Sequence, residues 1–240
     1  MTVPLYHQDS YLKEAPATVL AITDAGGIVL DQPLFYPQGG GQPGDSGWLE
    51  WNSRHAIPIA TTMRDADGHA VLVPMEPRPL PAPGDLVLQR LDLPRRLAHM
   101  RVHTALHLLS AVIPLPITGG AVSADRGRLD FMMPDPPADK QGLQDRLNAL
   151  VKSDLPVTQD WIGHDELLSR PDLIRTRDVA PPRGDGRVRM VRIGPADAPV
   201  DLQPCGGTHV RRTGEIGPLW LGKIEAKGRD HRRVHLVLAD

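Results

Sequence analysis

Arg101-Val-His-Thr-Ala-Leu-His-Leu-Leu109 places two histidines, His103 and His107, four residues apart in an apolar run. Residues four apart lie on the same face of an α-helix, so the two imidazoles can converge on one metal ion. Asp92 and Pro94 are typical of a helix start, and Pro114 ends the helical pattern. The stretch therefore predicts a helix from Asp92 to Pro114 that carries half of a metal site.

A second pair with the same spacing follows in Pro204-Cys-Gly-Gly-Thr-His209, which contains the only cysteine of the chain. Three imidazoles and one thiolate form a ligand set that suits zinc. We therefore predict a zinc site with four ligands, which are His103, His107, Cys205 and His209. His99 lies one helical turn before His103, and it is an alternative ligand or a residue that faces the substrate.

The predicted ligand set raises a chemical difficulty, because four protein ligands close a tetrahedral site whereas a catalytic zinc keeps one position open. The metal would be structural, or would become five-coordinate, or would lose one ligand to substrate or water. His209 is our candidate for the ligand that yields. A histidine pair on a helix can also be an ordinary packed feature, so the site depends on both pairs together.

The first ninety residues are typical of short antiparallel strands divided by glycine and proline. The strand pattern occurs in five segments, which are Thr18–Ile22, Ile28–Leu30, Ile57–Thr62, His69–Val73 and Val87–Leu91. Glycine turns join the first two segments and the next two, as in β-hairpins. We predict a small antiparallel β-barrel over residues 1–91, with a rigid connector formed by Pro77, Pro79, Pro81 and Pro83.

Residues 92–240 mix helical and strand patterns, and we predict an α/β domain with helices packed on a mainly antiparallel sheet. Leucines at helical spacing predict a helix over residues 139–153. Further predicted elements are a short helix at His164–Arg170, a Pro/Gly-rich loop at Asp178–Gly186, and strands at Gly119–Phe131, Arg187–Ile193, Leu219–Ile224 and Val234–Leu238. The Arg187–Ile193 strand is expected to carry one basic face. The complete chain is thus an α+β protein.

Phe35-Tyr-Pro-Gln-Gly-Gly-Gly-Gln-Pro-Gly-Asp45 is the second unusual segment. Three consecutive glycines, Gly39, Gly40 and Gly41, let the backbone approach whatever faces it, because no Cβ atoms intervene. Gln42 then offers both an amide donor and a carbonyl acceptor. The segment is a candidate pocket loop, and a flexible β-turn is an equally good interpretation.

Composition and charge indicate an ordinary globular protein of 240 residues, with 40% hydrophobic and 23% charged residues. The net charge of −2 does not indicate a nucleic-acid binder, but residues 1–90 hold five basic and ten acidic residues, and the remainder is net basic. A polyanion should therefore prefer the C-terminal part. No signal peptide or membrane-spanning run is indicated, and a single cysteine favours the cytoplasm.

His103-Thr-Ala-Leu-His107 together with Cys205-Gly-Gly-Thr-His209 resembles the editing domain shared by alanyl- and threonyl-tRNA synthetases. The segments Phe35–Asp45, Gly214-Glu-Ile-Gly217 and Lys223-Ile-Glu-Ala-Lys-Gly228 are similar to the alanyl branch. The likeness covers the whole chain, which leaves no room for an ATP-binding synthetase core. The sequence thus resembles the free-standing alanyl-tRNA editing proteins of the AlaX type that keep an N-terminal barrel, a translation-protein-like domain.

The resemblance implies hydrolysis of the ester that joins a wrong amino acid, serine or glycine, to the 3′ end of alanine tRNA. Pockets discriminate one methylene by only about 1–3 kcal/mol, so a second, hydrolytic site is needed. Zinc could polarise the ester carbonyl, hold the α-amino group or lower the pKa of a bound water. Because no glutamate adjoins the histidine pair, we expect a metal-positioned water, alone or aided by the terminal hydroxyl of the tRNA.

The resemblance also implies that the backbone amides of Gly39–Gln42 face the editing pocket. Ser123 is our candidate for recognising a serine hydroxyl, and a solvated turn residue is the alternative. We further expect phosphate contacts from a basic group, for which a solvated face is the alternative: Lys223, Lys227, Arg232 and Arg233.

Two other functions compete with the deacylase. One is a nucleic-acid-binding module with a purely structural zinc and no catalysis. The other is a hydrolase of amino-acid esters or aminoacyl-adenylates that ignores tRNA. The expected partner is mischarged alanine tRNA, with no membrane and no protein partner indicated. No coiled coil follows Asp240, so a monomer or a weak dimer is expected.

Overall fold

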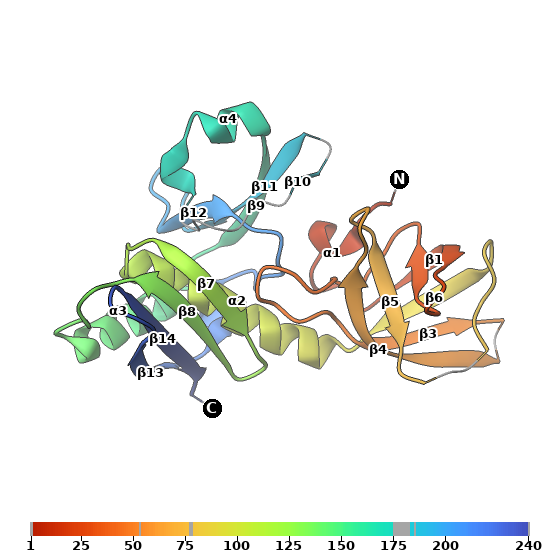
Figure 1. Cartoon of the computed structure of the whole chain (residues 1–240), viewed down its shortest axis with the longest axis horizontal. Coiled ribbons are helices and arrows are strands. Elements are labelled where there is room, and N and C mark those ends of the chain that lie inside the picture. The colour runs from red at the N-terminus through yellow and green to blue at the C-terminus, as the bar shows by residue number, and fades with distance from the viewer. Residues whose placement is uncertain (1, 53, 77–78, 175–182, 185, 240) are drawn as a thin grey trace. The chain divides into compact units, whose positions relative to one another are not determined.

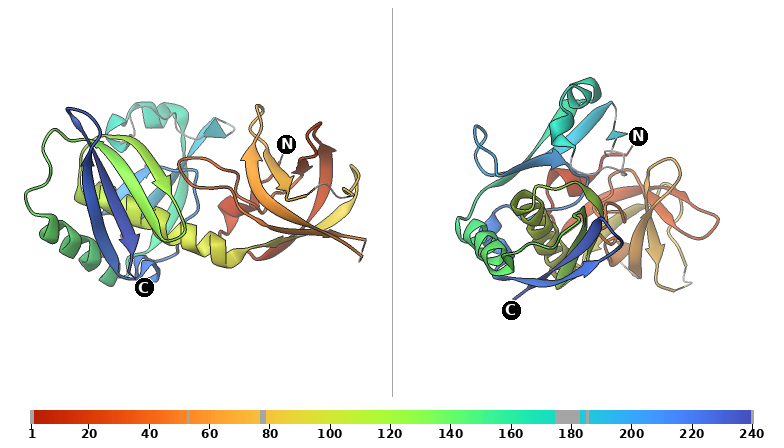
Figure 2. Two further views of the ribbon diagram at one scale, coloured as in Figure 1. Left: turned by 60° about the horizontal axis from the view of Figure 1, so that its bottom comes forward. Right: turned by 60° about the vertical axis from the view of Figure 1, so that its left-hand side comes forward.

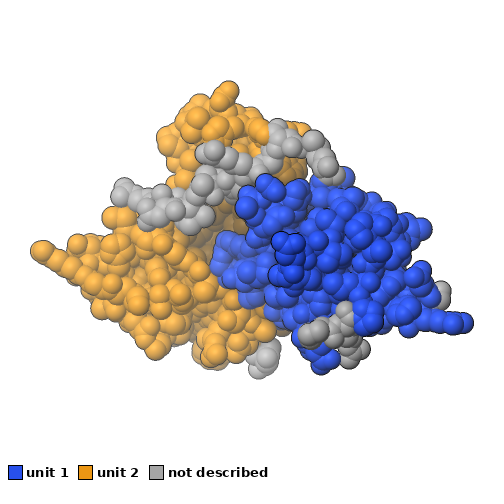
Figure 3. All heavy atoms as spheres, turned by 45° about the vertical axis from the view of Figure 1, so that its right-hand side comes forward, with its two compact units in different colours: residues 1–98 blue, residues 99–240 orange. Residues whose placement is uncertain are grey.

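The computed structural model describes every residue except 1, 53, 77–78, 175–182, 185 and 240. The predicted connector at Pro77 and most of the predicted loop at residues 178–186 therefore lie outside the described residues. The chain divides into two compact units, residues 1–98 and residues 99–240 (Figure 3). This division falls within helix α2 (Leu93–Val112), whereas the end of the strand pattern predicted a boundary between residues 91 and 92.

The first unit contains a closed barrel of antiparallel strands in the order β1-β2-β5-β4-β3-β6 (Figure 1). Its elements are a short helix α1 (Leu5–Gln8) and the strands β1 (Glu14–Ile22), β2 (Ile28–Leu30), β3 (Gly47–Trp51), β4 (His55–Arg64), β5 (Ala70–Pro74) and β6 (Leu86–Leu91). The prediction of a small antiparallel barrel is confirmed, and it missed only β3 among the strands.

Side chains at alternate positions of the strands point inward and fill the barrel. In β1, Ala15, Ala17 and Val19 point inward and are buried, whereas Pro16 between them is exposed and Thr18 is half-buried. Leu30 and Phe35 are fully buried in the same core. Burying one such side chain contributes about 1.5–3 kcal/mol, so this cluster is the main support of the first unit.

The second unit contains a four-stranded antiparallel sheet in the order β13-β14-β8-β7. Its strands are β7 (Ile117–Val122), β8 (Arg126–Met132), β13 (Leu219–Ala226) and β14 (His231–Leu238). Helices α2 and α3 (Lys140–Lys152) pack on one face of it (Figure 2). Gly127 of β8 permits a close approach, because a Cβ atom there would lie 2.7 Å from Val102 of α2. The predicted helix at residues 139–153 is confirmed within a residue at each end.

A second antiparallel sheet is built on β11 (Arg187–Ile193), which pairs with the other three strands. The other strands of this sheet are β9 (Val157–Gly163), β10 (Arg183–Gly184) and β12 (Asp201–Pro204). Helix α4 (His164–Leu168) and the 3₁₀ turn η1 (Pro171–Leu173) contact these strands, whereas the 3₁₀ turn η2 (Thr213–Ile216) contacts α3. Val188 and Met190 of β11 pack on Leu167 of α4. The predicted basic face of this strand is wrong at Arg189, which is only 3% exposed because its guanidinium is used internally.

None of the helices in the described part of the chain combines the length and the apolar character that crossing a bilayer requires.

Candidate metal centre

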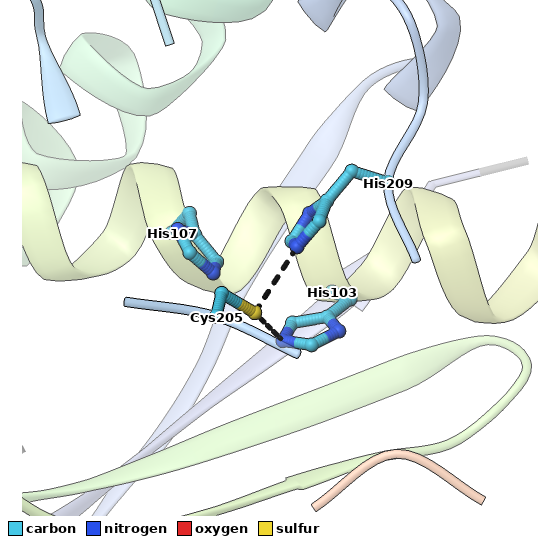
Figure 4. Close-up of side chains that lie close together, drawn as sticks. All are labelled: His103, His107, Cys205 and His209. Atoms are coloured by element: carbon cyan, nitrogen blue, oxygen red, sulfur yellow. Dashed lines mark hydrogen bonds between the residues drawn. The ribbon is translucent and has the colours of Figure 1, made fainter. Parts of the chain in front are cut away.

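Four potential metal ligands converge in the second unit (Figure 4). His103 and His107 come from successive turns of α2, and Cys205 and His209 come from the loop after β12. Their ligand atoms all lie within 4.8 Å of one another, and each of the three imidazoles is at most 7% exposed. Helix α2 begins as predicted, because the Asp92 carboxylate accepts the N–H of Arg95 at 3.2 Å. The alternative ligand His99 is buried but is not a member of this cluster.

The imidazoles present their Nε2 atoms to the thiol. Cys205 Sγ lies 3.6 Å from Nε2 of His103 and 3.3 Å from Nε2 of His209. The Nδ1 atom of His209 lies 3.1 Å from the hydroxyl of Thr104, which itself lies 2.8 Å from the Met100 carbonyl. If the hydroxyl donates to that carbonyl, it accepts the Nδ1–H of His209. The lone pair of His209 Nε2 is then directed at the cluster, as metal binding requires.

The electrostatics of the cluster favour a thiolate. Burial opposes ionisation of Cys205, but the imidazoles of His103 and His209 outweigh it and hold the thiol pKa well below its ordinary value. Burial also disfavours a charged His107, yet hydrogen bonds to Asp201 and Cys205 raise its pKa to about 10. Burial lowers the pKa of His209 to about 3. The metal-free site therefore pairs a thiolate with a protonated His107, and a metal ion would displace the Nε2 proton of His107 when it binds.

A buried arginine fixes the loop that carries Cys205. Nη1 of Arg189 donates to the carbonyls of Cys205 and Gly207, each at 2.8 Å, and Nε donates to Gln159 at 2.6 Å. The Cys205 N–H in turn donates to the Arg189 carbonyl at 3.1 Å. One guanidinium nitrogen thus bridges two carbonyls of the loop. Because Arg189 belongs to β11, this strand fixes the position of the thiol.

The glycine-rich segment forms a tight turn in the first unit. Gly39 and Gln42 exchange two backbone hydrogen bonds of 3.1 and 2.9 Å around Gly40 and Gly41. Both central residues have positive φ angles, +56° and +79°, as in the primed turns that favour glycine. Gln42 is fully buried. The glycines are thus required by the backbone of this turn, and its role in a substrate pocket stays a prediction.

A buried ion pair closes the base of that turn. Asp45 accepts the N–H of Tyr36 at 2.6 Å and the Nε–H of Arg96 at 2.8 Å. Arg96 also donates to the carbonyls of Leu34 at 2.7 Å and Ser10 at 3.1 Å. Neither charged side chain is more than 1% exposed. The turn is therefore anchored by a charge pair at the start of α2, within the first unit.

Ser123 lies in the turn between β7 and β8, where it is exposed and its N–H donates to the Arg126 carbonyl. Its proposed contact with a serine hydroxyl stays a prediction.

Three of the four predicted tRNA contacts have partners within the chain. Lys223 pairs with Glu225, and Arg232 donates to the carbonyl of Pro134. Arg233 forms a two-pronged pair with Asp130, with both distances 2.8 Å. Lys227 is exposed beside the β13–β14 turn. A phosphate would have to compete with these internal acceptors, and the four phosphate contacts stay predictions.

The Asp130 pair leads to a prediction about acid stability. Hydrogen bonds from Arg233 hold the pKa of Asp130 below its ordinary value of 3.8. A lowered folded-state pKa stabilises the fold above the unfolded-state pKa, and this contribution disappears as the pH falls through the folded-state value. Asp130→Asn should therefore destabilise the protein by on the order of 1 kcal/mol at pH 7 and by progressively less below about pH 4.

Thermal unfolding between pH 2.5 and pH 7 measures this difference. Asp125→Asn is the matched control, because its carboxylate is 64% exposed and lies 3.8 Å from Arg126. A deficit of Asp130→Asn that stays constant across the pH range would contradict the electrostatic explanation.

Sequence reasoning missed several residues that support the cluster. Asp201, Gln203 and Arg189 all touch a ligand or its loop, and Thr104 touches His209. One signal was available, because Asp201 and Gln203 are spaced two apart just before Cys205, so they share one face of a strand. No comparable signal identifies Arg189, since the same strand also contains Arg187 and Arg192.

Comparison with known proteins fits this arrangement. Residues 188–235 match the family model described as Threonyl and Alanyl tRNA synthetase second additional domain. That stretch includes Cys205 and His209, so half of the cluster belongs to a class of domain found in these synthetases. Alanine–tRNA ligase of Caldivirga maquilingensis is 34% identical over 93% of this chain, and the match spans 25% of the ligase.

Full-length relatives identify the family. The alanyl-tRNA editing protein AlaX-M of Methanosarcina barkeri is 35% identical, with the whole of both chains covered. The protein of the same name from Methanosarcina acetivorans is 32% identical, again over the whole of both chains. The present chain therefore belongs to the family of free-standing alanyl-tRNA editing proteins of the AlaX-M type. The resemblance inferred from the ligand motifs is confirmed.

Proposed function

We propose that this protein is a zinc-dependent deacylase that hydrolyses the ester of alanine tRNA mischarged with serine or glycine. The observation that carries the proposal is the cluster of three Nε2 atoms and one thiol, in a chain that belongs to an alanyl-tRNA editing family. We propose that this activity acts in trans, because the match to the alanyl-tRNA editing proteins covers the whole of those relatives.

The spacing of the ligand atoms supports zinc. Zinc binds sulfur at about 2.3 Å and imidazole nitrogen at about 2.0 Å, so a tetrahedral site separates the two ligand atoms by about 3.5 Å. The two sulfur–nitrogen distances at Cys205 are 3.6 and 3.3 Å. A thiolate with three imidazoles is also a donor set that binds zinc in preference to magnesium or calcium.

Bound zinc would supply Lewis acidity at the ester. The ion would be held by His103, His107, Cys205 and His209, and Arg189 would keep the thiolate loop in place.

We propose that the Gly39–Gln42 turn contributes backbone N–H groups to the substrate pocket. Gly40→Ala, which places a side chain at a φ angle of +56° and so strains the turn that carries these N–H groups, should then lower the deacylation rate without changing the zinc content. Ser123 and the basic group Lys223, Lys227, Arg232 and Arg233 are proposed for the serine hydroxyl and the tRNA phosphates.

The remaining expectations complete the proposal. Residues 1–91 would be a translation-protein-like barrel domain, and residues 92–240 a zinc-binding tRNA-editing domain. The protein would act in the cytoplasm as a monomer or a weak dimer. We assign no aspartate or glutamate as the general base that activates the attacking water. The attacking water would be positioned by the metal site, alone or with help from the terminal hydroxyl of the tRNA.

A deacylation panel tests the function. Alanine tRNA charged with serine, glycine or alanine is incubated with the protein, with and without a zinc chelator. We expect hydrolysis of the seryl or glycyl ester, sparing of the alanyl ester, and loss of activity with the chelator that returns when zinc is restored.

Two outcomes would favour the competing functions. Binding of tRNA without hydrolysis of any ester would indicate a nucleic-acid-binding module with a structural metal. Equal hydrolysis of a small serine ester and of seryl-tRNA would indicate a hydrolase that ignores the tRNA.

A further inference from the structure

The environment of His107 differs from that of His209. Its Nδ1 atom lies 2.8 Å from Oδ2 of Asp201, a carboxylate that is itself 1% exposed. An ionised carboxylate can only accept a hydrogen bond, so Nδ1 keeps its proton, and Nε2 is the nitrogen that can bind a cation once its own proton is displaced. The corresponding group at His209 is the neutral hydroxyl of Thr104.

The Asp201 carboxylate is itself held in place. Nε2 of Gln203 lies 2.8 Å from Asp201 Oδ2 and 3.2 Å from the Ser110 hydroxyl, which donates to the His107 carbonyl at 2.8 Å. Gln203 Nε2 also lies 3.0 Å from His107 Nδ1, but both are donors to the same carboxylate oxygen. Asp201 and Gln203 lie on one face of β12. They contact one face of α2, at His107 and Ser110, and all four residues are at most 7% exposed.

The contact between Asp201 and His107 also affects the net charge of an occupied metal site. A divalent ion with one thiolate and three neutral imidazoles leaves one net positive charge in a buried site. Uncompensated charge is costly in a protein interior. Asp201 places one negative charge within hydrogen-bond distance of a ligand, which brings the total to neutrality. A charge-assisted hydrogen bond also fixes the ring more firmly than a hydroxyl does.

We propose that Asp201, held by Gln203 and Ser110, is the positioning residue that orients His107 and balances the charge of the metal site. The proposal rests on the zinc site put forward above, and it concerns metal affinity rather than the hydrolytic step. Carboxylate partners of metal-bound histidines typically change metal affinity by about 10–100-fold.

Zinc affinity of the full chain, measured by competition with a chromophoric chelator, tests the proposal. Asp201→Asn keeps the shape and removes the charge, and it should weaken zinc binding by about 10–100-fold. Asp197→Asn is the matched control. It lies in the same connection before β12, it is exposed, and it should bind zinc as the unchanged protein does.

A rescue variant separates positioning from general stability. Because Gln203 Nε2 lies 3.0 Å from His107 Nδ1, Gln203→Glu would put a carboxylate oxygen at that place. Asp201→Asn combined with Gln203→Glu should therefore restore zinc affinity to within a few-fold of the original. Thermal unfolding of the chelated proteins shows whether Asp201→Asn acts on the metal-free fold, where we expect little change.

The outcomes are distinct. Unchanged zinc affinity in Asp201→Asn, with normal binding by the original protein, overturns this proposal and leaves the proposed function intact. Weaker binding that is matched by an equal loss of stability in the chelated protein, and is not restored by Gln203→Glu, assigns Asp201 a merely structural role. Failure of the original protein to bind zinc overturns both the metal site and this proposal.

Discussion

His103→Ala should leave the protein folded and reduce deacylation of the mischarged tRNA by about 10²-fold or more. The imidazole contributes one of four converging ligand atoms from a rigid helix, so its removal should empty or distort the metal site. A metal ion that acts as a Lewis acid is worth several kcal/mol in the transition state, and each 1.36 kcal/mol corresponds to a factor of ten in rate. Single-turnover deacylation and the zinc content of the purified variant are the measurements.

The control for this experiment is His231→Ala, a partly exposed histidine at the start of β14 in the same unit. It should retain both zinc and activity. Retention of full activity by His103→Ala would exclude a catalytic metal at this cluster. Unfolding of the original protein on chelation would instead indicate a structural zinc, since binding energy would then be folding energy.

Arg96→Met should destabilise the first unit by about 3–5 kcal/mol. The substitution leaves the Asp45 carboxylate buried without its guanidinium partner, and it also removes donors from the Leu34 and Ser10 carbonyls. Because the protein has two compact units, the free energy of unfolding should be measured for the first unit alone. Peptide-resolved hydrogen exchange of the barrel strands in a urea series gives that value.

Two further variants define the cause. Arg96→Met combined with Asp45→Asn should recover part of the loss, because the unpaired charge is then absent. Arg90→Met removes an arginine of the same unit whose pairs with Glu14 and Glu50 are largely exposed. It should have a far smaller effect, since exposed ion pairs contribute little. An equal effect of Arg96→Met and Arg90→Met would contradict the assigned role of the buried pair.

Local patterns in the sequence predicted most elements and all four members of the cluster. The hairpins around Gly26 and Gly68 and the helix that starts after Asp92 depend on contacts between near neighbours. The ligand pairs could be predicted because four residues span one helical turn. Strand β3 was missed, because its outward-facing residue Trp48 is apolar and hides the alternation of these five residues in the sequence.

Contacts between distant strands could not be predicted. Arg233 faces Asp130 only because of the register of β14 against β8, and Asp201 reaches His107 only because β12 lies beside α2. Arg95 and Arg96 are adjacent and chemically identical, yet one is partly buried and the other is fully enclosed. Tertiary packing decides which side chains meet and which become buried, and local patterns in a single sequence do not reveal this.

The solitary thiol has a practical consequence for handling this molecule. Cys205 is the only cysteine, and its sulfur faces three imidazole nitrogens that would share a cation with it. A thiol-reactive dye can therefore label one position per polypeptide and no other. Labelling would be slow while a cation occupies the sulfur and fast after the cation leaves. The fraction of labelled chains in a preparation would thus report its metal occupancy without any engineered probe.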